Sequence, residues 1–190
     1  MRTIFSDGYF GSYEENWHQF SSKRQEIFYL IDELDLLEQY CVFVDGTFTI
    51  IKDLDFTQIY IVSILMKYEN RTFSYPVALS LMRGRTADAY REFFGHLAQI
   101  FEQKNHRPLR IPKILSDAEA AIFRPINEIF PNTTLKLCKV HFSTDQIVSE
   151  LSQISINVYL AQLDIVEGFS GPVVMDRNHF MFIRKLIKKI

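Results

Sequence analysis

The stretch Cys41-Val-Phe-Val-Asp45-Gly46-Thr47-Phe48 decides how the rest of the chain is interpreted. Its apolar residues form a short run that ends at the carboxylate of Asp45. A second short run, Ile114-Leu115-Ser116, ends at Asp117, 72 residues after the first aspartate. Each aspartate therefore closes a predicted buried strand, where a carboxylate is costly unless it is exposed or holds a cation.

The segments after Cys41 predict three consecutive strands. Residues 41–50, 58–67 and 72–82 are rich in β-branched and aromatic side chains and are separated by short polar turns. This pattern is typical of an antiparallel meander. Because Pro76 lies inside the third segment, that segment is expected at a sheet edge or at a bulge.

Alternating helices and strands are expected next. Residues 86–103 carry an apolar face at helical spacing, and Thr86 can cap that helix. The later elements expected are a strand at 113–116, a helix at 118–130, a strand at 133–138 and a helix from about 141 to 151. The order βββαβαβα predicts an α/β fold, with a mixed sheet flanked by helices. In this order the fourth strand pairs beside the first, which would bring the two aspartates close together.

The two ends of the chain are interpreted separately. Apolar residues between Phe20 and Leu37 recur roughly at helical spacing, so residues 1–40 are predicted to be a helical lead-in. These 40 residues hold eight acids and three bases, a net charge of −5. Residues 152–190 end in a basic amphipathic stretch and are predicted to be the start of a helical insertion or tail.

Composition limits the class of protein. A length of 190 residues with 47% hydrophobic residues indicates one domain with a sizeable core. No run of about 18 apolar residues occurs, so no membrane span is expected. The net charge of −2 lacks the basic excess of a stand-alone nucleic-acid binder. Two cysteines, Cys41 and Cys138, do not make a disulfide framework.

The paired aspartates have two interpretations. Carboxylates on neighbouring strands are the usual ligands of a hard divalent cation such as Mg²⁺. Alternatively, each aspartate caps a following turn or helix, which is plausible for Asp117 because Ala118-Glu119-Ala120-Ala121 follows it. Glu119 is expected to favour the helix dipole rather than to bind metal. Arg83, Arg85 and Arg91 are expected on a solvated surface, with phosphate binding as the alternative.

Cys138 and His141 form a Cys-x-x-His motif. A closed zinc site needs four ligands, and the sequence has no second cysteine pair, so zinc is not expected. Taken alone, the motif favours a buried cysteine at a strand end and a histidine near a helix start.

Taken together, the motifs resemble a known family. In chain order they are Asp45-Gly-Thr-Phe48, Tyr75-Pro76-Val77-Ala78-Leu79, Tyr90 with Phe93-Phe94, Ser116-Asp117-Ala-Glu119-Ala-Ala121, Phe130-Pro131 and Cys138-Lys-Val-His141-Phe142. Residues 41–151 closely resemble the transposase domain of Mutator-like elements (MULE). The resemblance implies a ribonuclease H-like fold with an Asp-Asp-Glu metal site, in which Asp45 and Asp117 match the first two catalytic acids. Cys138 and His141 match the Cys-x-x-His motif of that family.

The resemblance also implies an activity. It is divalent-metal-dependent DNA strand cleavage and strand transfer, with Mg²⁺ or Mn²⁺ as cofactor and with transposon ends and target DNA as partners. The DNA substrate is the only reason to expect nuclear localisation, since no clear basic import signal is visible in the sequence. Whether the protein forms an oligomer is left open.

The third acid of the family is not assigned. It lies on a late helix behind a helical insertion, and the available acids, Glu150, Asp164 and Glu167, do not lie where the pattern puts it. The chain is therefore expected to be an incomplete transposase domain. The alternative is a catalytically inactive remnant, or a domesticated module that binds DNA or protein. Another ribonuclease H-like nuclease is a third interpretation, and the Cys-x-x-His motif argues against it.

Overall fold

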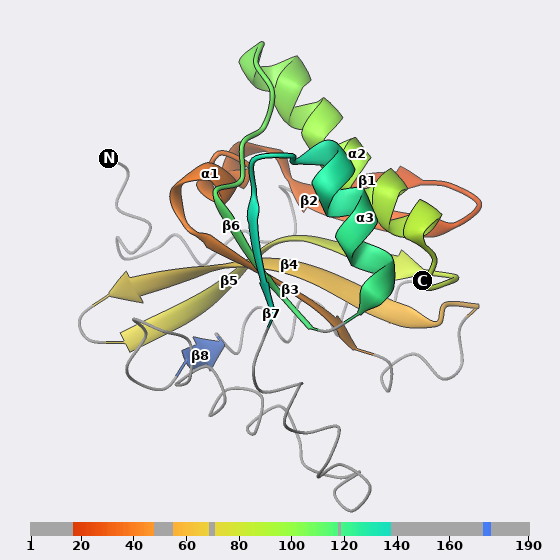
Figure 1. Ribbon diagram of the computed structural model, residues 1–190, viewed down its shortest axis with the longest axis horizontal. Coiled ribbons are helices and arrows are strands. Elements are labelled where there is room, and N and C mark those ends of the chain that lie inside the picture. Colours follow the sequence, from red (N-terminus) through yellow and green to blue (C-terminus); the bar gives the residue numbers. More distant parts are fainter. Residues whose placement is uncertain (1–16, 48–54, 69–70, 118, 138–172, 176–190) are drawn as a thin grey trace, which may run out of the picture.

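A computed structural model describes residues 17–47, 55–68, 71–117, 119–137 and 173–175 of the chain (Figure 1). The strands are β1 (Trp17–Ser21), β2 (Gln25–Leu30), β3 (Cys41–Thr47), β4 (Gln58–Tyr68), β5 (Arg71–Met82), β6 (Lys113–Ser116), β7 (Thr134–Leu137) and β8 (Val173–Met175). The helices are α1 (Leu36–Gln39), α2 (Ala87–Asn105) and α3 (Ala120–Ile129), with a 3-10 turn at Ile31–Glu33.

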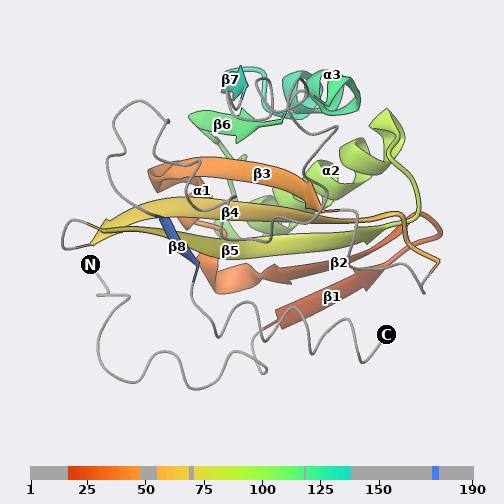
Figure 2. The same ribbon diagram turned by 90° about the horizontal axis from the view of Figure 1, so that it is seen from below.

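All described strands belong to one mixed sheet. Its order is β1-β2-β5-β4-β3-β6-β7, which Figure 2 shows from the lower edge to the upper, and β8 pairs with β5. The pairs β1–β2, β2–β5, β5–β4 and β4–β3 are antiparallel, whereas β3–β6, β6–β7 and β5–β8 are parallel. From Cys41 to Leu137 the elements follow the order βββαβαβ, so the predicted mixed α/β sheet is confirmed. The helix predicted at 141–151 lies outside the described residues.

The sheet is buried by two apolar clusters. One face packs against α2 and α3, which lie side by side across it in Figure 1. The largest fully buried side chains of this cluster include Tyr60, Tyr90, Phe93, Phe94 and Phe101. A smaller cluster contains Phe28, Phe56, Ile59, Leu79 and Leu81. Because side chains alternate along a strand, Ile59 and Tyr60 belong to different clusters and lie on opposite faces of the sheet.

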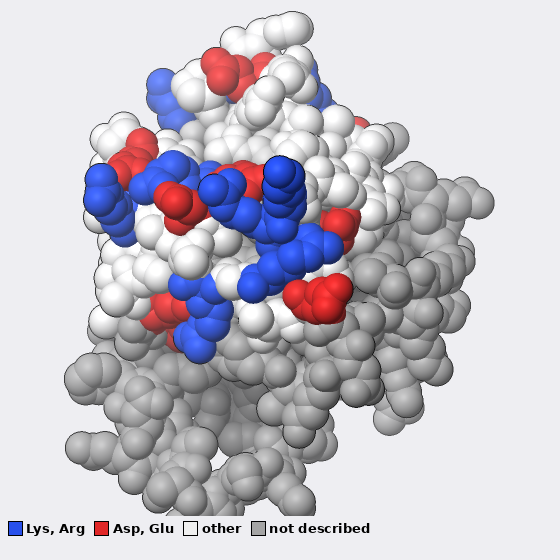
Figure 3. Space-filling view, turned by 90° about the vertical axis from the view of Figure 1, so that its right-hand side faces the viewer, with Lys and Arg blue, Asp and Glu red and all other residues white. Residues whose placement is uncertain are grey.

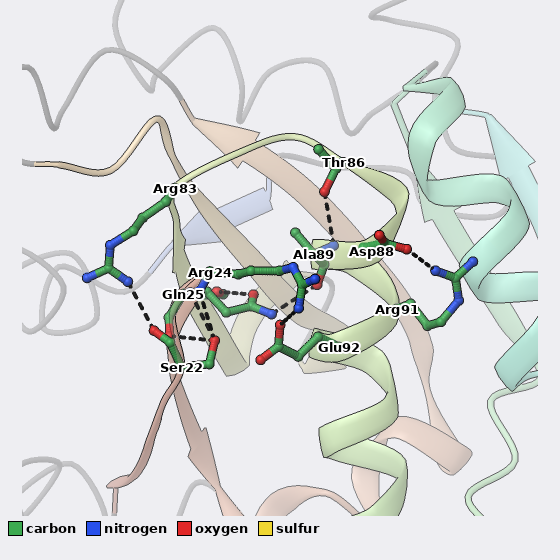
Figure 4. Close-up of polar contacts among 10 residues, drawn as sticks. Ser22, Arg24, Gln25, Arg83, Thr86, Asp88, Ala89, Arg91 and Glu92 are labelled. Carbon is green, nitrogen blue, oxygen red and sulfur yellow. Dashed lines mark hydrogen bonds and ion pairs between the residues drawn. The ribbon is translucent and has the colours of Figure 1, made fainter.

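Helix α2 begins and ends as its sequence predicts. The Thr86 hydroxyl oxygen accepts a hydrogen bond from the Ala89 backbone N–H at 3.2 Å (Figure 4), which confirms the predicted N-cap. At the other end His106 adopts the left-handed conformation (φ 55°) and donates its N–H to the Glu102 carbonyl. Within the described ranges, no helix combines the length and the apolar character needed to cross a lipid bilayer.

Pro76 lies at a bulge in an inner strand. β5 is flanked by β4 on one side, where the register shifts so that Val62 faces Ala78 and Ser63 faces Pro76. On its other side β5 pairs with β2 only from Ala78 onwards and with β8 only up to Ser74. Pro76 therefore lies between the part of β5 that pairs with β2 and the part that pairs with β8. Among the described residues, no strand pairs with it on that side, so the backbone N–H that proline lacks is not needed for a hydrogen bond there. The expectation of a bulge is confirmed, and that of an edge strand is wrong.

The prediction of a helical lead-in at residues 1–40 is wrong for residues 17–30. They form the antiparallel strands β1 and β2, and residues 1–16 lie outside the described residues. The turn between them is closed by Ser22, whose hydroxyl oxygen accepts hydrogen bonds from the backbone N–H groups of Arg24 and Gln25. Residues 152–190 were expected to be helical, but Val173–Met175 forms a strand, and the remainder lies outside the described residues.

Candidate metal centre

Asp45 lies in β3, two residues before its end, and Asp117 directly follows the neighbouring strand β6. β3 and β6 are parallel, and their last paired residues are Val44 and Ser116. The next residue in the chain is Asp45 in the first case and Asp117 in the second. The parallel register therefore brings the two carboxyl-bearing positions side by side at one edge of the sheet, and the predicted pairing of these strands is confirmed.

The buried phenol of Tyr60 reports the charges gathered at this edge. Tyr60 pairs with Gly46, the residue after Asp45, and its side chain is 0% exposed. Burial raises the pKa of Tyr60 well above its usual value, and the neighbouring groups Tyr90, Asp117, Asp45 and Glu119 raise it further, in that order. Three carboxylates therefore act on one buried hydroxyl. This hydroxyl has no hydrogen-bond partner among the described residues.

The pair of aspartates has the chemistry of a hard-cation site. Both side chains are partly exposed, and both offer carboxylate oxygens, which Mg²⁺ and Mn²⁺ prefer over nitrogen or sulfur. The gathered negative charge, which the Tyr60 pKa reflects, is what a divalent cation would neutralise. Among the residues that the structure describes, no group of three or more His, Cys, Asp or Glu side chains is arranged to hold a metal. The described part of the chain thus fits two carboxylate ligands of such an ion.

The alternative role of Asp117 as a helix cap does not match the observed helix. α3 begins at Ala120 and its N-cap position is Glu119. The Asp117 carboxylate instead accepts a hydrogen bond from the neighbouring Ser116 hydroxyl at 3.3 Å. Its position two residues before the cap leaves Asp117 directly after β6, beside Asp45 in β3.

Glu119 is bound by Tyr90 of α2 and by Arg85, which precedes α2, rather than by its own helix. Its carboxylate makes no capping hydrogen bond to α3. The Arg85 Nε donates to Oε1 at 3.0 Å, and the Tyr90 hydroxyl donates to Oε2 at 2.7 Å. The Tyr90 hydroxyl also accepts a hydrogen bond from the Gln58 Nε2 at 2.7 Å. The sequence analysis assigned Glu119 to the helix dipole and missed this network.

The arginines that follow β5 are paired with acids. Arg83 contacts Glu26, and Arg91 contacts both Asp88 and Glu128. The Arg91 contact with Asp88 is among the polar contacts drawn in Figure 4. On the side of the molecule in Figure 3, Lys and Arg side chains form a band with Asp and Glu side chains between them. The expected solvated surface is therefore an ion-paired one, and phosphate binding by these arginines stays a prediction.

The Cys-x-x-His motif lies outside the described residues. Cys138 and His141 therefore keep the role that the resemblance implies, as a prediction. The same holds for the acids Glu150, Asp164 and Glu167. The first cysteine, Cys41, is a free thiol at the start of β3, and burial raises its pKa.

The fold and the site define the class of protein. A mixed sheet of this order, flanked by helices and carrying two aspartates at adjacent positions in and after neighbouring parallel strands, is consistent with a ribonuclease H-like fold. A family model described as the MULE transposase domain matches residues 41–145, more than half of the chain, and the chain belongs to that family. The matched range contains Asp45, Asp117, Cys138 and His141. A comparison with curated proteins finds no match.

Proposed function

We propose that this chain is part of the catalytic domain of a DNA transposase, in which Asp45 and Asp117 hold a divalent cation. The observation that carries the proposal is the register of β3 and β6, which places both aspartates at one edge of the sheet in a chain of the MULE family. Mg²⁺ or Mn²⁺ suits a donor set made of carboxylate oxygens.

The proposed reaction is cleavage of a DNA phosphodiester followed by strand transfer. In the cleavage step, water attacks phosphorus and the bond from phosphorus to the 3′ oxygen breaks. The leaving oxygen takes up a proton to give a 3′ hydroxyl, and a 5′ phosphate remains on the other strand end. Bound divalent ions would lower the pKa of the attacking water and stabilise the leaving oxygen. The two aspartates would fix the ions at the sheet edge.

Titration calorimetry with MnCl₂ tests the metal site. We expect Mn²⁺ to bind the wild-type chain, and Asp45→Asn and Asp117→Asn to weaken binding by at least about tenfold. Asp55→Asn is the matched control, because it removes the same charge from an exposed aspartate. Unchanged Mn²⁺ affinity in Asp45→Asn would show that the site is misassigned.

A nicking assay separates the catalytic proposal from its alternative. Supercoiled plasmid is incubated with the chain and Mn²⁺, and nicked product is measured for the wild type and for Asp117→Asn. Nicking that disappears in Asp117→Asn supports the transposase. Mn²⁺ binding without any nicking would instead favour the non-catalytic alternative, a transposase-derived module that binds DNA or protein. If the protein acts on chromosomal DNA, we also expect it in the nucleus.

A further inference from the structure

Glu119 departs from what its position at the start of a helix favours. A carboxylate at an N-cap normally accepts hydrogen bonds from the first backbone N–H groups of its own helix. The Glu119 side chain makes no such bond, although it is only 8% exposed. Both of its oxygens are instead bound to α2 and the residue before its cap, through Tyr90 and Arg85. The start of α3 is thus held by another helix.

The groups that bind Glu119 are themselves fixed. Tyr90 is 0% exposed, and its hydroxyl accepts a hydrogen bond from Gln58, the first residue of β4. The Gln58 Nε2 also lies 3.0 Å from the Met82 sulfur at the end of β5. Arg85 directly precedes Thr86, the residue that caps α2. The clamp, which we define as Arg85, Tyr90 and Gln58 around Glu119, is therefore anchored in two strands and one helix.

The clamp holds the chain just beyond Asp117. On the strand side, Ser116 is fixed by its pairing with Val44, so Asp117 follows a residue locked in the sheet. On the helix side, Glu119 is fixed by the clamp. The described residues on either side of Asp117, which are Ser116 and Glu119, are therefore both fixed, and Asp117 lies beside Asp45. Side chains that orient a metal ligand without touching the ion are a general feature of metal sites.

We infer that Glu119, Arg85 and Tyr90 are positioning residues that hold Asp117 in register with Asp45 for divalent-cation binding. The inference rests on the proposed metal site. It also assigns Glu119 a role other than that of a metal ligand, because its carboxylate is ion-paired with Arg85 and, among the described residues, no three acids are arranged to hold a metal. The positive charge of Arg85 offsets the third carboxylate near the two aspartates.

A second contact between the same helices supplies matched controls. Arg91 on α2 donates from Nε to the Glu128 carboxylate at 2.8 Å. This ion pair joins α2 to the end of α3 that is opposite to Asp117. Arg91→Gln and Glu128→Gln therefore remove an arginine–glutamate ion pair between the same two parts of the fold, as Arg85→Gln does. A loss of helix packing alone would affect both pairs of variants.

The test combines Mn²⁺ affinity with hydrogen exchange on the full chain. Titration calorimetry is run on the wild type, Arg85→Gln, Tyr90→Phe, Arg91→Gln and Glu128→Gln. We expect Arg85→Gln and Tyr90→Phe to raise the Kd for Mn²⁺ by about 10- to 100-fold, as is usual when a supporting residue of a metal site is lost. We expect amide exchange to become faster in the peptide that joins β6 to α3. The Arg91 and Glu128 variants should show neither effect.

The direction of the affinity change separates the possible outcomes. Unchanged Mn²⁺ affinity in Arg85→Gln and Tyr90→Phe would overturn the inference and leave the clamp a purely structural contact. Tighter Mn²⁺ binding in these variants would also overturn it, because release of Glu119 would then supply a ligand. If the wild type itself binds no Mn²⁺, the proposed metal site fails, and the inference falls with it. The two failures can be distinguished, because failure of the metal site is seen as absent Mn²⁺ binding in the wild type, whereas failure of the inference is seen only in the variants.

Discussion

Removing the hydroxyl group from each of two buried core tyrosines should change the free energy of unfolding in opposite directions. The rings of Tyr60 and Tyr90 lie 5.0 Å apart at their centroids, and both side chains are 0% exposed. The Tyr60 hydroxyl has no hydrogen-bond partner among the described residues, whereas the Tyr90 hydroxyl is bound to Glu119 and Gln58. We therefore expect Tyr60→Phe to stabilise the protein and Tyr90→Phe to destabilise it.

The magnitudes follow from the two environments. A buried polar group without a partner costs about 1–3 kcal/mol, and a phenylalanine at position 60 removes that cost but leaves a small gap. The net gain in the free energy of unfolding is then about 1 kcal/mol, or about 2–4 °C in Tm for a domain of this size. A hydrogen bond to a charged group is worth about 1.5–3 kcal/mol, so Tyr90→Phe should lose about 2 kcal/mol. The two variants should differ by about 3 kcal/mol.

Urea unfolding followed by the fluorescence of Trp17, the single tryptophan, measures both variants. The slope of the free energy with urea should stay unchanged, so that the shift in midpoint reports stability. A loss of more than about 0.5 kcal/mol in Tyr60→Phe would refute the reasoning, since it would mean that the hydroxyl has a partner in solution. Equal losses in the two variants would refute it as well.

Three further predictions concern the metal, the pH and one helix end. Mn²⁺ at a hundredfold excess over its wild-type Kd should stabilise the wild type by about 2.7 kcal/mol in a thermal-shift assay, and at the same concentration it should stabilise Asp117→Asn, with its at least about tenfold weaker binding, by no more than about 1.4 kcal/mol. His96 stacks on Phe20 at 4.2 Å, and burial lowers its pKa, so the stability that it contributes is present above about pH 6.5 and is lost as the pH falls through its folded pKa. Urea midpoints between pH 7.5 and 5 should therefore decline less in His96→Phe than in the wild type, and an equal decline would contradict this. The exposed residue His106 has φ 55°, so His106→Gly should raise the free energy of unfolding by about 1 kcal/mol, whereas His106→Ala should not.

The central part of the fold could be predicted because its patterns are unambiguous. Residues from Cys41 to Met82 are rich in β-branched side chains and are broken by polar turns, and α2 has a continuous apolar face with a threonine cap. The pairing of β3 with β6 followed from the order of the elements. The closeness of Asp45 and Asp117 therefore required no knowledge of side-chain packing.

The β1–β2 hairpin could not be predicted from the same patterns. Residues 27–31 form an unbroken apolar run, and such a run fits a buried helix as well as a strand buried on both faces. In β2, Ile27 packs in the cluster that also contains α2, and Phe28 packs in the smaller cluster, so both faces need apolar residues. The turn at Ser22 contains neither Gly nor Pro, the residues that most often mark a hairpin.

The clamp around Glu119 was missed for a different reason. Arg85 and Glu119 are 34 residues apart, and only the packing of α2 beside α3 brings them together. A helix start with an acid at the cap predicts a local hydrogen bond, which tertiary contacts replace here. One signal was present in the sequence. Tyr90 lies on the apolar face of α2, and a buried tyrosine needs a partner for its hydroxyl.

On one side, β5 pairs with β2 along one part of its length and with β8 along another. This has a consequence for folding during synthesis on the ribosome. Residues 72–74 of β5 pair on this side with 173–175, so this part of the strand waits for a segment made 99 residues after Ser74. At about 5–20 residues per second, the delay is roughly 5–20 s. During that time a nascent chain carries an open strand edge in the middle of its sheet, where a second chain can pair. Fragments that stop before Val173 should therefore associate through this edge in sedimentation experiments, and a chaperone that covers it would act before β8 is made.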